Sequence, residues 1–97
     1  MLDVNFAIIN SDKLPGGVPL DPVEVLIEKV PPNGLGNVVF DAMVQLKQRA
    51  EAAMANVIYA VRREEIPVGY GNALYNVRYT AQTCRMATED LVRVHEE

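Results

Sequence analysis

The amino-acid sequence predicts an all-α fold in which an antiparallel helical hairpin is joined by a short helix and an extended N-terminal arm. Two observations predict it. Apolar residues recur at helical spacing on both sides of one segment, and that segment, "IPVGYGN" at 66–72, holds the proline and glycines of a reversal. The hairpin is expected at about 37–65 and 72–95, and the short helix at about 22–30. We expect a single domain over 1–97, with 1–20 as the arm and 21–97 as the helical body.

The first long helix is expected to begin after Asn37, a residue type that can cap a helix N-terminus. Neither proline nor glycine interrupts the chain from there to Glu65, and Pro67 ends the pattern. The apolar residues keep the heptad spacing that is typical of a coiled coil. They are Val39, Met43, Leu46, Ala50, Ala53, Val57 and Ala60.

The glycines between the two long helices are expected to form a bend. A potassium-channel filter would need membrane helices around it, and a dinucleotide-binding loop would need a preceding strand and a third glycine where Leu74 stands. In the simpler interpretation, Pro67 ends one helix, Gly69 and Gly71 allow positive φ, and Asn72 caps the next helix. A turn this short makes its two flanking elements antiparallel neighbours.

The second long helix carries its own apolar stripe, which is expected to face the first helix across a seam of small side chains. The stripe consists of Leu74, Val77, Ala81, Cys84, Thr88 and Leu91. Alanine-lined contacts bury little apolar area, so they stabilise a hairpin weakly. The first helix also carries apolar residues outside the seam, at Phe40, Val44, Met54 and Ile58. One partner helix cannot cover these side chains as well, so we expect a further surface to pack against them.

The short helix and the arm are inferred from local patterns. Asp21 and Pro22 are typical of a helix start, and Pro31 of a helix end. In the arm, Leu2, Val4, Phe6 and Ile8 alternate at the period of a strand. Because no second strand is predicted in the chain, the arm is expected to bind a neighbour's sheet edge or a groove.

Composition narrows the classes of function. The chain has 97 residues and a formal charge of −4, which argues against nucleic-acid binding despite several arginines. Those arginines are Arg62, Arg63, Arg78, Arg85 and Arg93. The N-terminus lacks a basic signal-peptide region, and no apolar run reaches the length of a membrane span. A single cysteine suits a reducing compartment, so we expect a cytoplasmic or virion-associated protein.

No catalytic, cofactor or metal site is predicted. Cys84 lies on the apolar stripe and is expected to be a small buried hydrophobe. His95, the single histidine, is eleven residues further along, roughly 16 Å on a helix, which is too far for a dyad. Glu24 and Glu28 share a face of the short helix, but no third ligand stands at metal spacing.

The sequence therefore predicts a non-enzymatic assembly subunit, either a homo-oligomer or part of a hetero-assembly. Expected settings are a virion head, neck or tail component, or a secretion-type filament. The layout of an N-terminal arm and two helices around a Pro/Gly bend is similar to that of needle and inner-rod proteins of secretion systems, although no family motif matches. The alternative is a small cytosolic helical chaperone or regulatory module that binds a partner helix. Residues expected at the interface are Leu2, Val4, Phe6, Ile8, Phe40, Val44, Ile58, Tyr70, Tyr75 and Tyr79.

Overall fold

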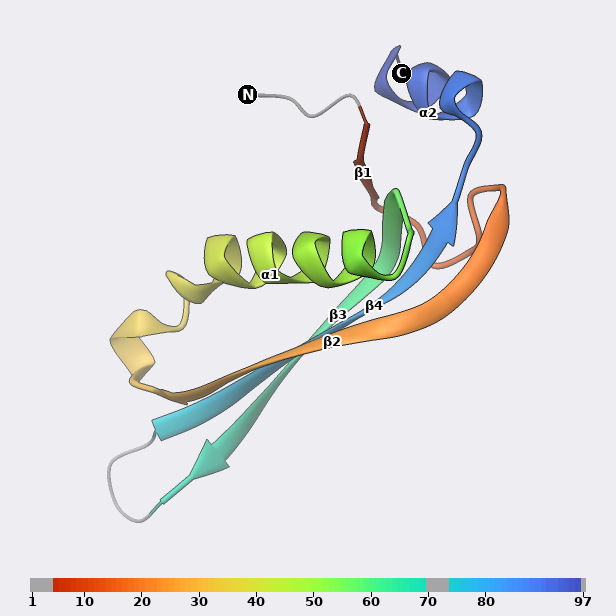
Figure 1. The fold of residues 1–97 in the computed structure, drawn as a ribbon. Helices are drawn as coiled ribbons and strands as arrows, with labels where there is room; N and C mark the ends of the chain where they lie inside the picture. Colours follow the sequence, from red (N-terminus) through yellow and green to blue (C-terminus); the bar gives the residue numbers. More distant parts are fainter. Residues whose placement is uncertain (1–4, 70–73, 97) are drawn as a thin grey trace.

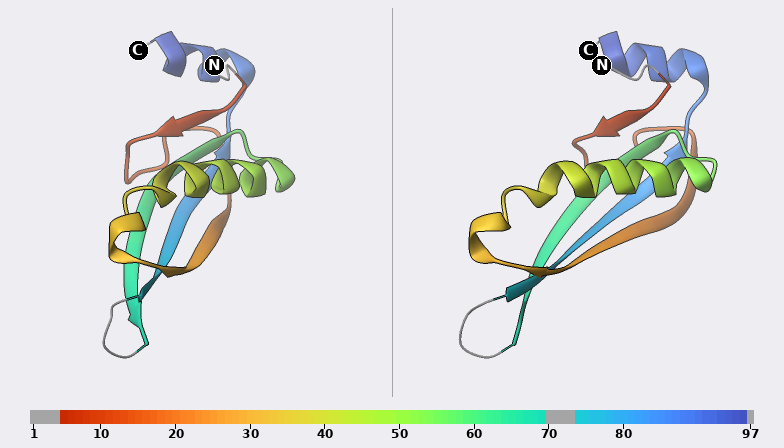
Figure 2. Two further views of the ribbon diagram at one scale, coloured as in Figure 1. Left: turned by 90° about the vertical axis from the view of Figure 1, so that its left-hand side faces the viewer. Right: turned by 60° about the vertical axis from the view of Figure 1, so that its left-hand side comes forward.

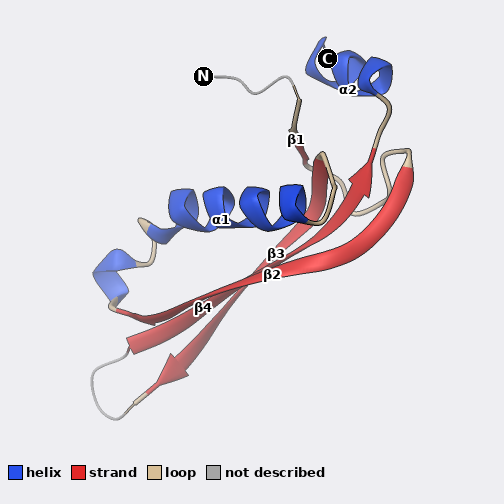
Figure 3. Cartoon of the chain, viewed as in Figure 1, coloured by secondary structure: helices blue, strands red, loops and turns tan. Residues whose placement is uncertain are grey.

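The computed structural model describes residues 5–69 and 74–96 and shows a mixed α/β fold (Figure 3). The prediction of an all-α hairpin, and with it that of a coiled coil, is wrong. The described elements follow the order β1 (Ala7–Ile9), β2 (Val18–Val30), the 3-10 turn η1 (Pro32–Gly34), α1 (Val38–Ala52), β3 (Val57–Val68), β4 (Leu74–Arg85) and α2 (Thr88–Glu96).

The four strands form one sheet in the order β1-β3-β4-β2. Strands β3 and β4 are antiparallel neighbours, and β2 pairs with the other side of β4, also antiparallel. Strand β1 pairs with β3 in parallel, with Ala7 aligned to Val57 and Ile9 to Tyr59. The glycine segment thus does join two antiparallel neighbours, but they are strands; Gly69 has φ +84°, and residues 70–73 lie outside the described chain.

Helix α1 lies across one face of the sheet, as Figures 1 and 2 show. Its buried residues Ala42, Leu46 and Ala50 repeat every four positions and form the stripe that meets the strands. Opposite them lie alternating residues of β2, β3 and β4, among them Val25 and Val77, which are both fully buried. Small alanines at two of the three contact positions let the helix approach the sheet closely, and Leu46 supplies most of the buried volume.

Residues 22–30, predicted as a short helix, lie instead within strand β2. The segment alternates, because Val23, Val25 and Ile27 pack towards the core while Glu24 and Glu28 are exposed. Pro22 lies within the register shift between Leu20 and Val23 and belongs to an edge strand, where a missing N–H is tolerated. The capping pattern was therefore misleading, since proline and aspartate also suit a bulged strand edge.

The predicted helix over 37–65 is two elements, α1 and β3. Helix α1 starts after Asn37 as predicted, although the Asn37 side chain makes no capping hydrogen bond. It ends without glycine: Met54 has φ +69°, its N–H donates to the Glu51 carbonyl, and the N–H of Ala55 donates to the Ala50 carbonyl. This pair of bonds is a Schellman motif, which normally has glycine in the left-handed position.

The predicted helix over 72–95 is also two elements, β4 and α2. In β4 the buried residues Val77, Tyr79, Ala81 and Thr83 occur at every second position, which is the period of a strand. Residues four apart, such as Val77 and Ala81, share a face in both a strand and a helix, because four is close to one helical turn and is twice the strand period. The apolar stripe chosen from the sequence was compatible with either structure.

A second, smaller core lies at the β1 end of the sheet, on the face opposite α1. Its buried residues come from β1, β3, β4 and α2, and they are Ala7, Val57, Tyr59, Cys84, Met86 and Leu91. The Asn56 side chain holds this end together, since its Nδ2 donates to the Met86 carbonyl and its Oδ1 accepts from the Met86 N–H, each at 2.9 Å. Helix α2 contacts β1 at this end of the sheet, and Figure 1 shows it above α1.

The arm predicted to lack a partner in the chain finds one in β3. The N–H of Ala60 further donates to the Ser11 carbonyl at 2.7 Å, so the pairing continues past the end of β1. The molecule as a whole is elongated, with extents of 52 × 26 × 22 Å and a radius of gyration of 15.0 Å. A compact chain of this length has a radius of gyration of about 12.5 Å.

We expect Leu46→Ala to lower the free energy of unfolding by about 2–5 kcal/mol, because Leu46 is fully buried between α1 and the sheet. Leu26→Ala is the matched control: Leu26 is 46% exposed on β2, and its loss should cost about 1 kcal/mol or less. Urea denaturation followed by circular dichroism measures both. Equal losses in the two variants would contradict the described packing.

We expect Gly17→Ala to lower the free energy of unfolding by more than about 1 kcal/mol. Gly17 has φ +75°, and a Cβ built there would lie 2.2 Å from the Arg85 carbonyl oxygen. In Gly36→Ala the new Cβ meets nothing within 4 Å, so its effect should be close to zero or slightly stabilising. Thermal unfolding of the two variants decides; a Gly17→Ala protein as stable as Gly36→Ala would be inconsistent with the approach of this loop to the end of β4.

Candidate functional site

A groove with a volume of about 430 Å³ lies on the surface between β1 and α1. One wall comes from β1 and the loop after it, the other from α1, and the floor from β3. The lining residues are Ile8, Ile9, Asn10, Ser11, Asp12, Met43, Ala60, Val61 and Arg62. We call this hollow the β1–α1 groove.

The floor of the groove is a β-bulge in β3. The register of β3 against β4 shifts between Tyr59 and Arg62, and within this shift Ala60 has φ +51°. A non-glycine residue in the left-handed region costs about 1–2 kcal/mol. Here the hydrogen bond from the Ala60 N–H to Ser11 holds the strained conformation in place. Bulges redirect side chains and bend strands, so this one shapes the groove next to β1.

The β1 wall presents Ile8 to the surface. Ile8 is aligned with Ile58, which is buried under α1, so both side chains belong to the helix-covered face of the sheet. Phe6, two residues earlier on that face, is buried, and the Nζ of Lys47 on α1 lies 5.6 Å from the centre of its ring. Ile8 is 52% exposed. On this face of the sheet, α1 therefore covers Phe6 but leaves Ile8 exposed.

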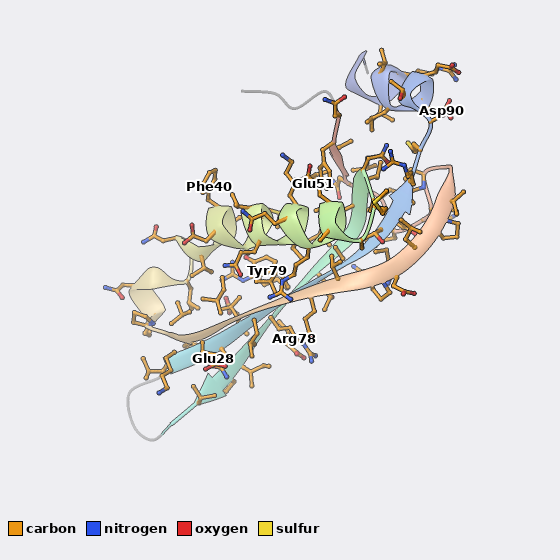
Figure 4. All side chains as sticks on the ribbon, in the orientation of Figure 1. Glu28, Phe40, Glu51, Arg78, Tyr79 and Asp90 are labelled. Atoms are coloured by element: carbon orange, nitrogen blue, oxygen red, sulfur yellow. The ribbon has the colours of Figure 1, made fainter. Side chains whose placement is uncertain are left out.

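The α1 wall presents Met43, with Phe40 and Val44 beside it. Phe40 is 75% exposed, the largest fraction among the described large apolar side chains, and Figure 4 shows it pointing away from the sheet. At 100° per residue, Phe40 lies about 40° from Val44 and about 60° from Met43 around the helix axis. Met43 lines the groove, so Phe40 lies next to the groove on the same side of α1. We call Ile8, Phe40, Met43 and Val44 the apolar flank.

The charged groups at the rim of the groove are paired. The Arg62 guanidinium lies 3.1 Å from the Asp12 carboxylate, and both side chains are about 70% exposed. An ion pair this exposed contributes little to stability. The Ser11 hydroxyl donates to the Lys13 carbonyl and accepts from the Lys13 N–H, both at 3.1 Å. Polar and charged side chains thus form this rim of the groove, where the acid and the base are paired with each other.

The structure places three of the residues predicted at the interface together. Ile8, Phe40 and Val44 lie on the apolar flank, whereas Phe6, Ile58 and Tyr79 are buried in the core and Tyr75 is half-buried against it. Leu2, Val4 and Tyr70 lie outside the described residues. Met43 was assigned to the seam between the two predicted helices by its heptad position. Its place beside Phe40 on the helical wheel is the sequence signal that could have identified it as part of the apolar flank.

Four of the five arginines considered for phosphate binding, Arg62, Arg63, Arg78 and Arg85, are engaged within the chain. Arg63 donates to the Tyr79 hydroxyl at 2.9 Å and to the Leu35 carbonyl at 2.8 Å, and it pairs with Glu65. On the opposite face of the sheet, shown in Figure 4, Arg78 bridges Glu24 at 3.4 Å and Glu64 at 2.6 Å. The Arg78 guanidinium thus carries two acidic partners, which makes this patch a cross-strand network on β2, β3 and β4.

The residues weighed for catalysis or metal binding do not converge. Cys84 is fully buried in the smaller core, and burial raises the pKa of its thiol, so the reactive thiolate is disfavoured. His95 lies in α2, with its side chain outside the described part of the structure. Within 5–69 and 74–96, no group of three or more His, Cys, Asp or Glu residues could hold a metal ion. Neither described helix is both long and apolar enough to cross a membrane.

Comparisons with models of protein families, with curated proteins and with solved structures yield no match to this chain.

We expect the stability of the protein to fall more steeply at alkaline pH than that of a Cys84→Ala variant. Burial raises the pKa of Cys84, so the unfolded chain loses this proton first. The contribution is fully present below the pKa of an unfolded cysteine, about 8.5, and is lost as pH rises through the pKa of the folded state. Urea midpoints at pH 7 and pH 9.5 provide the measurement. Parallel pH profiles in the two proteins would show that the thiol is not buried.

Proposed function

We propose that this chain is a non-enzymatic assembly subunit that packs against another protein through the apolar flank. The observation that carries the proposal is Phe40, an aromatic side chain that is 75% exposed on α1 beside the β1–α1 groove. Fully burying a phenylalanine contributes about 1.5–3 kcal/mol. Exposed apolar patches of this kind mark protein-interaction sites more often than scattered single residues do.

The rigidity of the surroundings supports this role. Helix α1 is held on the sheet by Ala42, Leu46 and Ala50, all fully buried, while Phe40 points the other way. The flank is thus presented on a helix and a strand, with little conformational freedom to lose on binding. Preorganised surfaces of this type lose less free energy in association than loops do.

The groove also lacks the arrangement that an enzyme would need. Its hydroxyl group, that of Ser11, bonds to the backbone of Lys13, and its carboxylate, that of Asp12, pairs with Arg62. The hydroxyl and the carboxylate that acid–base or covalent catalysis could use on this lining are thus each held by another group. These contacts support a binding surface rather than a reaction centre.

Of the settings that the sequence suggested, two depended on a helical body. The secretion-type filament was suggested by a helical layout, and the chaperone or regulatory module was expected to be helical. Because the fold is not all-α, both settings lose this support and the proposal is not built on them. A virion head, neck or tail component demands no particular fold and stays part of the proposal. The partner is either a second copy of the chain or another protein of the assembly.

Site-specific photo-crosslinking tests the proposal. The full chain is produced in its native host with a photoreactive phenylalanine analogue at position 40 or at position 26, and the adducts are identified by mass spectrometry. Leu26 is the matched control, since it is apolar and 46% exposed but lies on the opposite face of the sheet. We expect a defined adduct, with a second copy or with one identified protein, from position 40 alone. Equal or absent labelling at the two positions would overturn the proposal.

A further inference from the structure

We infer that the free edge of β3 pairs antiparallel with the same edge of a second copy of this chain. The two sheets then form one continuous sheet, with a two-fold axis at Glu64. This edge continues along β3 beyond the β1–α1 groove, and the inference goes beyond the proposed function without resting on it. It follows from the unequal protection of the two sheet edges and from the order of charges along one of them.

Strand β3 has a neighbour on its outer side only near its start. There β1 aligns with Val57–Tyr59, and the Ser11 carbonyl accepts a hydrogen bond from the Ala60 N–H. From Arg62 to Val68, β4 is the only strand among the described residues that pairs with β3. Figures 1 and 2 show this part of β3 extending past α1 towards the hairpin end. Residues 62–67 are all exposed, so the edge presents backbone donors and acceptors to solvent.

The opposite edge of the sheet, β2, is better protected against a further strand. It contains Pro19 and Pro22, and its register against β4 shifts twice. Prolines and bulges are devices by which edge strands avoid pairing with another chain. The register of β3 against β4 is regular from Arg62 to Val68, and Pro67 stands only near the end of this stretch. A regular length of β3 is therefore available for pairing.

The order of charges along this edge is complementary to an antiparallel copy of itself. Arg62 and Arg63 precede Glu64 and Glu65, so antiparallel pairing sets the basic half of each strand against the acidic half of the other. Charges of a single sign would make the edge repel a second copy, which is how charged edges commonly prevent pairing. A partner strand of a single sign would likewise be repelled by half of this edge. The charge order thus favours a second copy as the partner.

The two-fold axis has one favoured position. Residues directly opposite each other in an antiparallel pair lie on the same face, so two identical strands are centred on a residue that stands opposite its own copy. Centring on Arg63 would carry Val68 of the copy to Ile58, where β1 already lies. Centring on Glu65 would place Arg63 opposite Pro67 and lose the opposite charges. Centring on Glu64 pairs residues 62–66 of both copies and sets Arg63 opposite Glu65.

In this register the ion pairs within each chain are kept. Arg63 and Glu65 lie on the α1 face, opposite the buried Tyr79 and Val77, and their side chains are 2.8 Å apart. The antiparallel copy adds a second such pair in reversed order, so the four charged groups alternate in sign. On the other face, Glu64 stands opposite its own copy, and each Glu64 lies 2.6 Å from Arg78 of its own chain. The repulsion between the two acids is thus compensated within each chain.

The length of the paired edge sets the expected strength. A ladder over residues 62–66 is short, so the interface falls below the roughly 800 Å² that each partner contributes to a standard stable interface. The dimer should therefore dissociate on dilution, with a Kd on the order of micromolar or weaker. Sedimentation equilibrium of the full chain over a wide concentration range measures this Kd.

Hydrogen exchange of the unmodified chain locates the contact. Mass spectrometry compares the exchange of peptides above and below the Kd. We expect amides on the free edge within residues 62–66 to exchange about tenfold more slowly in the dimer, because the second strand bonds to them. Amides of the β2 edge, within 18–30, should exchange at one rate at all concentrations. A dimer that protects residues outside β3 and leaves 62–66 unchanged would overturn the inference.

Charge reversal tests the register. Glu65→Arg sets an arginine opposite Arg63 twice in each homodimer, so we expect the Kd to rise by at least about tenfold. The matched control is Glu28→Arg, which makes the same change of charge on the exposed β2 edge and should not weaken the dimer. Equal weakening by the two reversals, or an unchanged Kd for Glu65→Arg, would contradict the register.

A mixture of two reversed variants gives the decisive result. Arg63→Glu sets two acids opposite each other and should weaken its own homodimer as well. In the heterodimer of Arg63→Glu with Glu65→Arg, both opposed pairs again carry opposite charges, so its Kd should be at least about tenfold lower than that of either variant alone. Arg63 also donates to Tyr79 and Leu35, so thermal unfolding is measured beside it. If Arg63→Glu fails to fold, hydrogen exchange of the unmodified chain decides.

The failure of this inference is distinct from that of the proposed function. An unmodified chain that stays monomeric at all concentrations overturns the pairing of β3 edges, as does a mixture that associates no more tightly than the two variants alone. Crosslinking from position 40 tests the apolar flank separately, since Phe40 lies on α1 and not on the β3 edge. A reversible dimer with protected 62–66 amides and recovery in the mixture supports the inference.

Discussion

The contact between α1 and the sheet is the interaction on which the rest of this structure depends. The helix buries Ala42, Leu46 and Ala50 against residues contributed by strands that are far apart in the sequence. Without this cover, the alternating apolar residues of β2 and β4 would face solvent, and only the smaller core at the β1 end of the sheet would remain. The same contact decides which side of α1 remains free, and thereby places Phe40 and Val44 on the surface.

The reversal after α1 couples this contact to the groove. Met54 adopts a left-handed conformation that glycine would adopt more easily, and the chain then enters β3 directly. Three residues after β3 begins, Ala60 takes a second left-handed conformation in the bulge. The hydrogen bonds at the end of α1 hold Met54 in its conformation, and the pairing of β3 with β4 and β1 holds Ala60. Ala60 lines the β1–α1 groove, so the bulge forms part of its floor.

The two faces of the sheet have different roles. The face under α1 is apolar and closes the main core, whereas the middle of the opposite face carries the Arg78 network with Glu24 and Glu64. The two ends of the sheet differ as well. At the β1 end, α2 and the hydrogen bonds from the Asn56 side chain to the Met86 backbone close a second, smaller core. An assembly contact through the apolar flank would therefore extend the main core outwards at the edge where α1 and β1 meet, and would leave the charged face exposed.

Part of the site could be predicted from the sequence. The segment around Phe40 and Val44 carries more apolar residues than one neighbouring helix could cover, and both residues do lie on the exposed apolar flank. The alternation around Ile8 correctly indicated an extended arm, of which Ala7–Ile9 forms a strand. The partner of that arm was not foreseen, because β3 had been assigned to a helix.

What the sequence determined by itself was local: the start of α1 after Asn37, the extended segment around Ile8, and a reversal that makes its two flanks antiparallel. Tertiary structure decided the rest. Between residues 53 and 68, and again between 74 and 85, residues four apart share a face in a helix and in a strand alike, so the apolar pattern suits both. Strand pairing with β2 and β1 resolved this ambiguity in favour of the sheet, since only there do Val25, Val77 and Ile58 come together beneath Leu46. Those long-range contacts are absent from any local window of the sequence.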